Sequence, residues 1–491
     1  MDYMFLKSGT DIRGYASDLG GKEVQLTDTA VDDIVSAFVV WYINKFDKDP
    51  TELKISLGHD SRITADRICD TVKNALIGSG VTVIDCGLAS TPAMFMTTVD
   101  LGVDAAIEIT ASHHPFDRNG IKIFLPSGGL EGSFVSEILS LASDGIRVEN
   151  VNSGKIVETN YMNDYAKILR KLIIDGVGRG DRPLEGKKIV VDAGNGVGGF
   201  YANDVLKPLG ADITGSHYLE PDGMFPNHIP NPEDKTAMTS ICDAVLTNSA
   251  DLGIIFDTDV DRAGCVGPDG AEINRNRLIA LASYIAMGGK KGMTVVTDSV
   301  TSDGLKDYIE NTLGGKHYRY RRGYKNVIDK AIELCSKGVD CPLAIETSGH
   351  AALKENYFLD DGAYLATKIV IEVAKGTDIT ELLESLKMPA DELECRIGIT
   401  AEKFKEYGNM VIEELEKYIS VKDDYKIADD NREGIRVSSK DGWFLLRLSV
   451  HDPVMPLNFE SNTKTGISDM ISDLKPFLKK FGGLSLPEIL N

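Results

Sequence analysis

A chain of 491 residues is longer than one hydrophobic core normally serves, so we expect three or four domains with a cleft between them. Hydrophobic residues make up 42% of the sequence and charged residues 26%, which is typical of globular proteins and argues against disorder. The formal net charge of -22 argues against nucleic acid and anionic membranes as partners, and it requires a local basic pocket for any anionic ligand.

The cysteines and the N-terminus indicate the compartment. The seven cysteines are scattered and include no CxxC pair, so we expect reduced thiols and no zinc site. No apolar stretch is long enough to span a membrane, and the opening MDYMFLKSGTD lacks the pattern of a signal peptide. We therefore expect a cytoplasmic protein.

The first predicted element is an amphipathic helix. Apolar residues from Val31 to Phe46 fall on one face at helical spacing, and Thr27 or Asp28 is the expected cap. Strand-length apolar runs then recur, each followed by polar or glycine-rich residues and a helical pattern. These runs are KISLGHD, VTVIDCG, AAIEIT, KIVVDAGNG, LGIIFDTD, MTVVTDS and PLAIETSGH. Their order predicts repeated βα units.

The C-terminal part differs from the rest. Its short strands GIRVSS, GWFLLRLS and PLNFES have no helices between them, and a final helix follows. We predict an α/β protein of four domains, three βα-layered and one C-terminal α+β. The predicted bounds are 1–155, 156–263, 264–386 and 387–491, with linkers at 148–160 and 386–394.

Ser112 follows a buried strand, Ala105 to Ile109, in the stretch ITASHHPFDRNGIKIF. The end of such a strand is where α/β sheets usually carry their chemistry. A hydrolase triad with His113 or His114 has little support, because adjacent side chains point apart and no GxSxG motif is present. A serine that carries phosphate fits the stretch better.

The stretch DTDVDR places Asp257, Asp259 and Asp261 directly after another apolar strand. Three carboxylates at alternate positions suit Mg²⁺ or Ca²⁺, and such a cation would balance a phosphate on a serine. An EF-hand is excluded, because Arg262 and Pro268 stand where its glycine and glutamate belong. A solvated acidic turn is the alternative, and we favour the metal site.

The glycines of DAGNGVGG satisfy GxGxxG at Gly194, Gly196 and Gly199. Alone, this motif predicts a dinucleotide site and a dehydrogenase. Glycines also permit tight packing between a strand and a helix without any ligand, and this is the interpretation we prefer.

Glu346, Ser348 and His350 in AIETSGH offer an acceptor, a hydroxyl and a group that titrates near neutral pH. This set suits the recognition of sugar hydroxyls. A helix N-cap at Ser348 is an equally good explanation of the serine.

Two further stretches contain residues that can bind an anion. In RLSVHDP, Arg447 with Ser449 and His451 can hold a phosphate, because a guanidinium matches two oxygens at once. In YRYRRGYK, Lys325 precedes a helical pattern and can touch an anion. Exposed loop cations are the alternative for both.

Four of these stretches occur in an order that resembles the signature loops of the α-D-phosphohexomutases. TASHHP with NGIK resembles the phosphoserine loop, DTDVDR the metal loop, ETSGH the sugar loop and RLSVHDP the phosphate loop. SGTDIRG, GHDSR and EPDGMFPNHIPNP resemble further family segments, so the likeness covers essentially the whole chain. The tail most resembles a bacterial and plastid subgroup of phosphomannomutases, phosphoglucomutases and phosphoglucosamine mutases.

The resemblance implies four domains around a central cleft and an isomerase that interconverts hexose 1-phosphate and hexose 6-phosphate through phosphoserine. The implied catalytic residues are Ser112, Lys122, His113, Arg13, Arg262 and His350. The implied substrate ligands are Glu346, Ser348, Lys325, Arg447, Ser449 and His451. The implied metal ligands are Ser112, Asp257, Asp259 and Asp261, which would hold one Mg²⁺.

The resemblance also implies partners. They are small sugar phosphates, with a hexose 1,6-bisphosphate as activator. The chain itself is expected to be a monomer or a homodimer. Glucose and mannose phosphates are the expected substrates, with phosphoglucosamine mutase or a weakly catalytic sugar-phosphate-binding protein as alternatives. Thr258 and Val260 stand where the family often has glycine, so we expect ordinary dihedral angles there.

Overall fold

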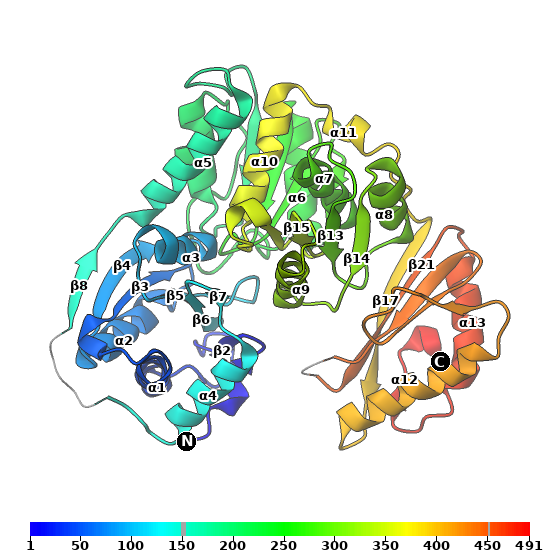
Figure 1. The fold of residues 1–491 in the computed structure, drawn as a ribbon, viewed down its shortest axis with the longest axis horizontal. Coiled ribbons are helices and arrows are strands. Elements are labelled where there is room, and N and C mark those ends of the chain that lie inside the picture. The colour runs from blue at the N-terminus through cyan, green and yellow to red at the C-terminus, as the bar shows by residue number, and fades with distance from the viewer. Residues whose placement is uncertain (149–153, 450–451) are drawn as a thin grey trace. The chain divides into compact units, whose positions relative to one another are not determined.

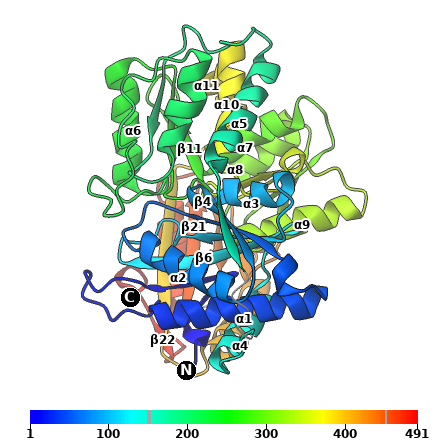
Figure 2. The same cartoon turned by 90° about the vertical axis from the view of Figure 1, so that its left-hand side faces the viewer.

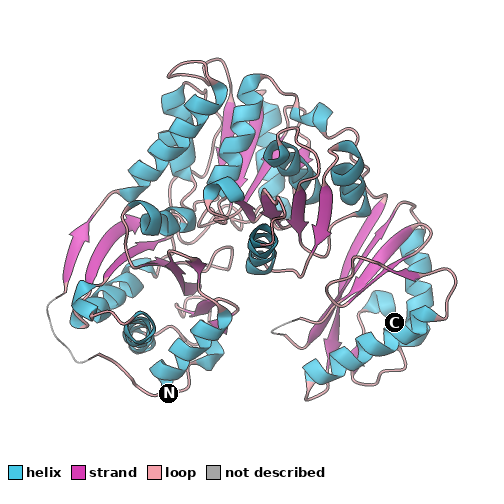
Figure 3. Cartoon of the chain, viewed as in Figure 1, coloured by secondary structure: helices cyan, strands magenta, loops and turns pink. Residues whose placement is uncertain are grey.

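The computed structural model describes residues 1–148, 154–449 and 452–491, which divide into two compact units. Unit 1 contains Met1–Leu278 and Ser348–Thr380, and unit 2 contains Ile279–Thr347 and Glu381–Asn491. Figure 1 traces the chain through its elements, and Figure 3 distinguishes helices from strands by colour. The layered α/β parts and the sheet-rich C-terminal part confirm the predicted fold class.

The N-terminal sheet of unit 1 has the strand order β1-β2-β6-β5-β3-β4-β8, with β7 paired to β6. Strands β5, β3, β4 and β8 are parallel, whereas β6 runs antiparallel to both β2 and β5. The strands are β1 (Lys7–Ser8), β2 (Asp11–Tyr15), β3 (Lys54–His59), β4 (Thr82–Leu88), β5 (Ala105–Ile109), β6 (Arg118–Leu125), β7 (Gly128–Gly129) and β8 (Lys155–Glu158).

Helices cover both faces of this sheet. Helix α1 (Asp28–Phe46) packs against α2 (Ala65–Gly78) and α4 (Gly132–Ser143) on one face, as Figure 2 shows, and α3 (Thr91–Asp100) contacts β3, β5 and β6. The predicted first helix is confirmed, and Thr27 is its cap, because its Oγ1 accepts the N–H of Ala30 at 3.2 Å. Short 3-10 turns lie at η1 (Met4–Leu6) and η2 (Pro50–Glu52).

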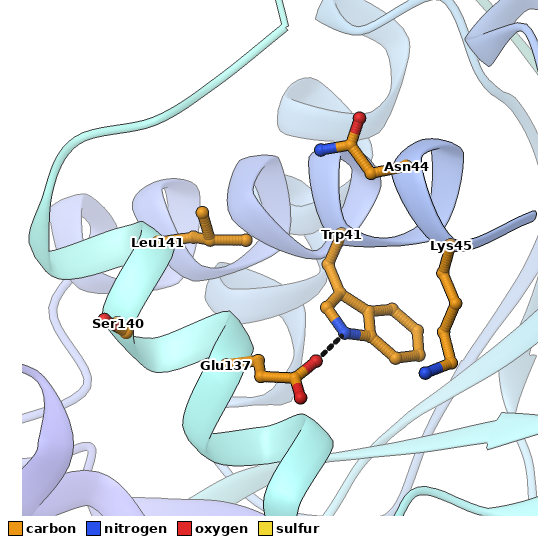
Figure 4. Close-up of a pocket in the computed structure, with 6 residues that line it drawn as sticks. All are labelled: Trp41, Asn44, Lys45, Glu137, Ser140 and Leu141. Atoms are coloured by element: carbon orange, nitrogen blue, oxygen red, sulfur yellow. Dashed lines mark hydrogen bonds between the residues drawn. The ribbon is translucent and has the colours of Figure 1, made fainter. Parts of the chain in front are cut away.

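A pocket of about 500 Å³ opens between α1 and α4 (Figure 4). The indole Nε1 of Trp41 donates to Oε2 of Glu137 at 2.7 Å there, and the ammonium of Lys45 lies over the Trp41 ring. The pocket therefore belongs to the packing of the two helices.

The second sheet of unit 1 has the order β12-β11-β10-β9, from β9 (Ile189–Asp192), β10 (Leu252–Phe256), β11 (Ala263–Val266) and β12 (Glu272–Ile273). Because β9 and β10 are parallel, their carboxyl ends meet at one edge. The other elements of this part are α5 (Tyr161–Val177), η3 (Tyr201–Leu206), η4 (Lys207–Leu209), α6 (Lys235–Asn248), β16 (Ala351–Leu353), η6 (Lys354–Asn356) and α10 (Gly362–Lys375).

Unit 2 contains a parallel arrangement β14-β13-β15 and an antiparallel sheet β18-β19-β20-β21-β17-β22. The first includes β13 (Thr294–Thr297), β14 (Lys316–Arg319) and β15 (Leu343–Ile345), with α8 (Asp303–Asp307), η5 (Tyr308–Thr312) and α9 (Tyr324–Ser336). The second includes β17 (Asp391–Ile399), β18 (Lys426–Ile427), β19 (Ile435–Ser438), β20 (Gly442–Leu446), β21 (Val454–Ser461) and β22 (Leu484–Ser485), with α12 (Phe404–Ser420), α13 (Gly466–Leu478) and η7 (Glu488–Leu490). Helices α7 (Arg275–Met287) and α11 (Ile379–Leu382) each contain a boundary between the units.

Arg436 joins the two parts of unit 2. Its guanidinium donates to the carbonyl oxygens of Ser299 at 3.0 Å and Thr301 at 3.2 Å, and lies 3.5 Å from the ring centre of Trp443. The C-terminal sheet is therefore anchored to the loop after β13 by a buried cation.

Two stretches that we expected to be linkers contribute strands. Residues 155–158 form β8, which pairs with β4, and residues 391–394 begin β17. Both strands are held by backbone hydrogen bonds and begin with exposed side chains, so they lack the apolar pattern that reveals a strand. The domain bounds stay a prediction.

All seven cysteines are free thiols in the structure. Among the described residues, no helix has both the length and the apolar composition needed to cross a bilayer.

Candidate active site

Ser112 lies in the loop between β5 and β6 and is 1% exposed. Its backbone has φ 52°, in the left-handed region that non-glycine residues rarely adopt. Its Oγ donates to Oδ2 of Asp257 at 3.0 Å and lies 3.3 Å from Nδ1 of His113. The hydroxyl is therefore directed at the acidic loop.

Asp257, Asp259 and Asp261 extend from the loop between β10 and β11. All three are buried, and one carboxylate oxygen of each lies within 4.8 Å of the others. This burial contradicts the alternative of a solvated acidic turn. The residue type, burial and mutual distance of these groups suit a hard divalent cation.

The cluster is charged unevenly. Burial and the neighbouring carboxylates of Asp261 and Asp259 raise the pKa of Asp257 well above its ordinary value. Burial acts in the same direction on Asp261, but the cations of Lys122 and Arg262 outweigh it and lower the pKa of Asp261.

Lys122 is the counter-ion of this cluster. It lies in β6, directly opposite Glu108 of β5, and its residue is 3% exposed. Its Nζ lies 3.1 Å from Oδ2 of Asp259 and 2.5 Å from Oδ2 of Asp261. A second hydrogen bond to Asp259 comes from Oγ1 of Thr91 at 2.5 Å.

Val260 corrects an expectation. We expected ordinary dihedral angles at this position, but Val260 has φ 66°, which is rare for a β-branched residue. The side chain is fully buried, and its carbonyl oxygen accepts the N–H of Gly362 at 3.1 Å. These tertiary contacts impose a conformation that glycine would adopt without strain.

Further cations and a second histidine lie near His113, the neighbour of Ser112. Arg13 in β2 pairs with Asp11 at 2.6 Å, and the backbone N–H of Arg262 donates to Asp257 at 3.2 Å. Burial, with Arg262 nearby, lowers the pKa of His113, and burial with Arg13 lowers the pKa of His114 to about 3. Both imidazoles are therefore neutral near neutral pH.

His350 is held between an acid and a cation. Its Nδ1 lies 2.5 Å from Oδ2 of Asp360, and Nε of Arg262 donates to its Nε2 at 2.9 Å. This arrangement places the imidazole proton on Nδ1 and leaves Nε2 as the acceptor.

The glycines of DAGNGVGG, after β9, pack closely against neighbouring backbone. A Cβ at Gly196 would lie 2.6 Å from the carbonyl oxygen of Thr258, and one at Gly199 would lie 2.1 Å from that of Leu219. These glycines let the backbone approach its neighbours, which favours the packing interpretation over a dinucleotide site.

The residues expected to contact sugar and phosphate belong to both units. Ser348 and His350 lie in unit 1, whereas Glu346 lies in unit 2 and accepts the N–H of Gly323 at 2.5 Å. Within unit 2, Lys325 in α9 pairs with Asp329 at 3.0 Å.

Arg447 and Ser449, which are expected to bind phosphate, follow β20. Arg447 is mostly buried, and this burial lowers its pKa while Glu433 opposes the effect. Ser449 accepts the N–H of Asp452 at 3.2 Å. His451 lies outside the described residues.

Several residues near the site escaped sequence analysis. Thr91 contacts Asp259, Asp360 contacts His350, and Arg62 contacts the backbone of the Ser112 loop. The sequence contains the DD pair at 360–361 and the stretch GHDSR, but neither pattern indicates which loop its side chains contact.

Comparison with known proteins gives three family matches along the chain. Models described as phosphoglucomutase/phosphomannomutase alpha/beta/alpha domains I, II and III match residues 10–144, 164–270 and 274–388. Together they cover well over half of the sequence.

Individual proteins match over most of their length. The phosphomannomutase/phosphoglucomutase of Pseudomonas syringae pv. tomato is 30% identical over 89% of this chain and 89% of its own. The phosphoglucomutase of Neisseria gonorrhoeae is 29% identical over 87% of this chain and 88% of its own. The crystal structure of a phosphoglucomutase/phosphomannomutase family protein from Burkholderia thailandensis is 25% identical, with a TM-score of 0.81 over 99% of this chain and 100% of its own.

Proposed function

Because the chain belongs to the phosphoglucomutase/phosphomannomutase family, we propose that it is a Mg²⁺-dependent phosphohexomutase that works through phosphorylated Ser112. Its substrates are hexose 1-phosphate and hexose 6-phosphate, with glucose or mannose as the sugar. One observation carries the proposal: the Ser112 hydroxyl lies 3.0 Å from Asp257 at the edge of a buried acidic cluster.

The reaction consists of two phosphoryl transfers. In the first, the P–Oγ bond of phospho-Ser112 breaks and the phosphoryl group bonds to the 6-hydroxyl oxygen of a hexose 1-phosphate; the proton of that hydroxyl passes to a base, and the released Ser112 oxygen takes a proton. In the second, the bond between phosphorus and the sugar 1-oxygen breaks and the 1-phosphoryl group of the resulting bisphosphate bonds to Ser112 Oγ; the serine hydroxyl gives up its proton, and the released sugar oxygen takes one. A hexose 1,6-bisphosphate therefore primes unphosphorylated enzyme, and no oxidant or water is consumed.

Lys122 and His350 are the proposed proton donor and acceptor. The carboxylates of Asp259 and Asp261 stabilise the ammonium form of Lys122, which favours Lys122 as the donor. The lone pair on Nε2 of His350 favours that residue as the acceptor once Arg262 turns to a phosphate.

Arg13 and Arg262 are the proposed cations that neutralise the moving phosphoryl group, because phosphoryl transfer depends mainly on positioning and charge neutralisation. His113 is neutral near neutral pH, so we assign it a hydrogen bond to the phosphoryl group rather than a charge.

Ser112, Asp257, Asp259 and Asp261 are the proposed ligands of Mg²⁺. The buried atoms Oδ1 of Asp259 and Oδ1 of Asp261 have no hydrogen-bond partner among the described residues, as expected of carboxylates that complete their contacts with a cation. When bound, Mg²⁺ offsets the negative charge of the phosphoryl oxygens.

We propose that the sugar hydroxyls are bound by Glu346 and Ser348. The phosphate that does not react is bound by Lys325, Arg447, Ser449 and His451. We also propose that the protein works in the cytoplasm, where free thiols persist.

The test is an isomerase assay of purified protein with Mg²⁺, a hexose 1,6-bisphosphate primer and the 1-phosphates of glucose, mannose and glucosamine. We expect turnover of glucose or mannose 1-phosphate, intact-mass detection of one phosphate on Ser112, and loss of both in Ser112→Ala. Turnover of glucosamine 1-phosphate alone would instead favour a phosphoglucosamine mutase. Inactivity on all three sugars, or full activity of Ser112→Ala, would refute the proposal.

A further inference from the structure

A buried guanidinium, that of Arg62, supports the loop that carries Ser112. Arg62 follows β3, is 2% exposed, and donates to four backbone carbonyl oxygens, three in this loop and one at the first residue of β6. The acceptors are those of Ser112, His114 at 2.6 Å, Pro115 at 2.6 Å and Arg118 at 3.0 Å. A guanidinium suits this task because its N–H donors are fixed in one plane.

Asp60 holds the guanidinium and reaches the other end of Ser112. Its Oδ2 accepts two hydrogen bonds, one from Nε of Arg62 at 3.1 Å and one from Oγ1 of Thr110 at 2.7 Å. The backbone N–H of Ser112 in turn donates to Oγ1 of Thr110 at 2.9 Å. The carbonyl and the N–H of Ser112 are therefore both tied, directly or through Thr110, to one ion pair.

This arrangement counters two unfavourable features of the loop. Ser112 has φ 52°, and such a conformation persists only where the surroundings impose it. Four carbonyl dipoles also converge on one buried point, where only a cation with several donors can satisfy them together. Because a buried ion pair is weak evidence for stability alone, its contacts to the Ser112 backbone suggest a role in placing that residue.

We propose that Arg62 and Asp60 are positioning residues that fix Ser112 Oγ in line for phosphoryl transfer. This inference rests on the proposed function. It assigns the pair no contact with substrate: the pair acts through the backbone of Ser112, and loosening it displaces the reacting oxygen.

The first test replaces Arg62 with lysine, which keeps the charge but offers three donors at one point. We expect Arg62→Lys to lower kcat about 100-fold, the scale of a 1 Å misplacement, with little change in the KM for hexose 1-phosphate. Arg67→Lys is the matched control, because Arg67 is in the same domain and also donates to two backbone carbonyls, those of Ala16 and Leu26. That variant should keep the wild-type kcat.

A second pair of variants guards against misfolding. Thr110→Val removes the hydroxyl that links Asp60 to the Ser112 N–H, while Thr110→Ser restores it. We expect kcat to fall in the valine variant and to recover most of its wild-type value in the serine variant. Each kcat is divided by the concentration of folded protein, which circular dichroism gives.

Hydrogen exchange of the amides at 112–118 gives a readout that does not need activity. Exchange should be faster in Arg62→Lys and unchanged in Arg67→Lys. Wild-type kcat and wild-type exchange in folded Arg62→Lys, or equal kcat in the two Thr110 variants, would overturn the inference. If wild-type protein turns over no hexose phosphate, the proposed function fails, and the exchange result still decides whether Arg62 orders the loop.

Discussion

The ammonium of Lys122 lies 2.5 Å from Oδ2 of Asp261 and 3.1 Å from the carboxylate of Asp259, with all three residues buried. The acidic cluster is thus neutralised in part by a lysine from a different sheet, more than 130 residues away in sequence. A divalent cation that binds these carboxylates must compete with this ammonium.

Removing that competitor should strengthen metal binding. We expect Lys122→Met to bind Mn²⁺, used as a spectroscopic substitute for Mg²⁺, more tightly than the wild type in an electron paramagnetic resonance titration. Without metal, the variant should unfold at a lower temperature, because breaking a buried ion pair costs about 3–5 kcal/mol. Lys73→Met, which removes the partly exposed pair with Asp85, is the control. Unchanged Mn²⁺ affinity would show that Lys122 does not compete.

Glu108 should make stability depend on pH. Its side chain is fully buried in β5, and neither carboxyl oxygen has a hydrogen-bond partner among the described residues. Burial, with Asp60 and Asp259 nearby, raises its pKa well above the ordinary value of 4.5. The stability it contributes is therefore fully present below about pH 4.5 and is lost as pH rises towards the folded-state pKa.

Glu108→Gln removes this ionisation. We expect the unfolding temperature of the variant, relative to the wild type, to rise between about pH 4.5 and about pH 8, measured by calorimetry. The exposed Glu131→Gln serves as the comparison. A difference between Glu108→Gln and wild type that stays constant with pH would contradict a neutral Glu108.

His217 and His228 share the buried carboxylate of Asp192, at 2.8 Å and 3.0 Å. Burial lowers the pKa of each histidine, but the hydrogen bonds and charge of Asp192 outweigh it and raise both above the ordinary 6.5. The stability from these pairs is therefore full below about pH 6.5 and is lost as pH rises through the folded-state values.

The segment 217–228 should accordingly open more easily at higher pH. We expect its hydrogen exchange, corrected for intrinsic rates, to lose protection between about pH 6 and about pH 9, and Asp192→Asn to remove most of this dependence. A pH dependence in the asparagine variant equal to that of wild type would show that another group is responsible.

Gly196 tests the packing role of the glycine run. A Cβ there would lie 2.6 Å from the carbonyl oxygen and 2.8 Å from Cα of Thr258, inside the acidic loop. We expect Gly196→Ala to destabilise the protein by about 1–3 kcal/mol in denaturant unfolding and to weaken Mn²⁺ binding. Gly482→Ala, whose Cβ would meet nothing within 4 Å, should be neutral. A stable Gly196→Ala variant that instead loses NAD binding shown by the wild type would support the dinucleotide alternative.

The sequence determined those features that depend on local pattern. The period of apolar residues predicted the first helix with Thr27 at its cap, and the order of strands and helices predicted the layered α/β fold. The placement of Ser112 and the three aspartates after apolar strands also followed from pattern, because α/β sheets usually carry their chemistry at the carboxyl ends of their strands.

Only the tertiary structure decided how these groups are held. Arg62 meets the carbonyl of His114 across more than 50 residues, Lys122 meets the aspartates from another sheet, and Val260 takes a backbone conformation that its side chain disfavours. Such contacts join distant segments and leave no periodic trace in the sequence, since periodicity reports which face of an element is buried and not what lies against it.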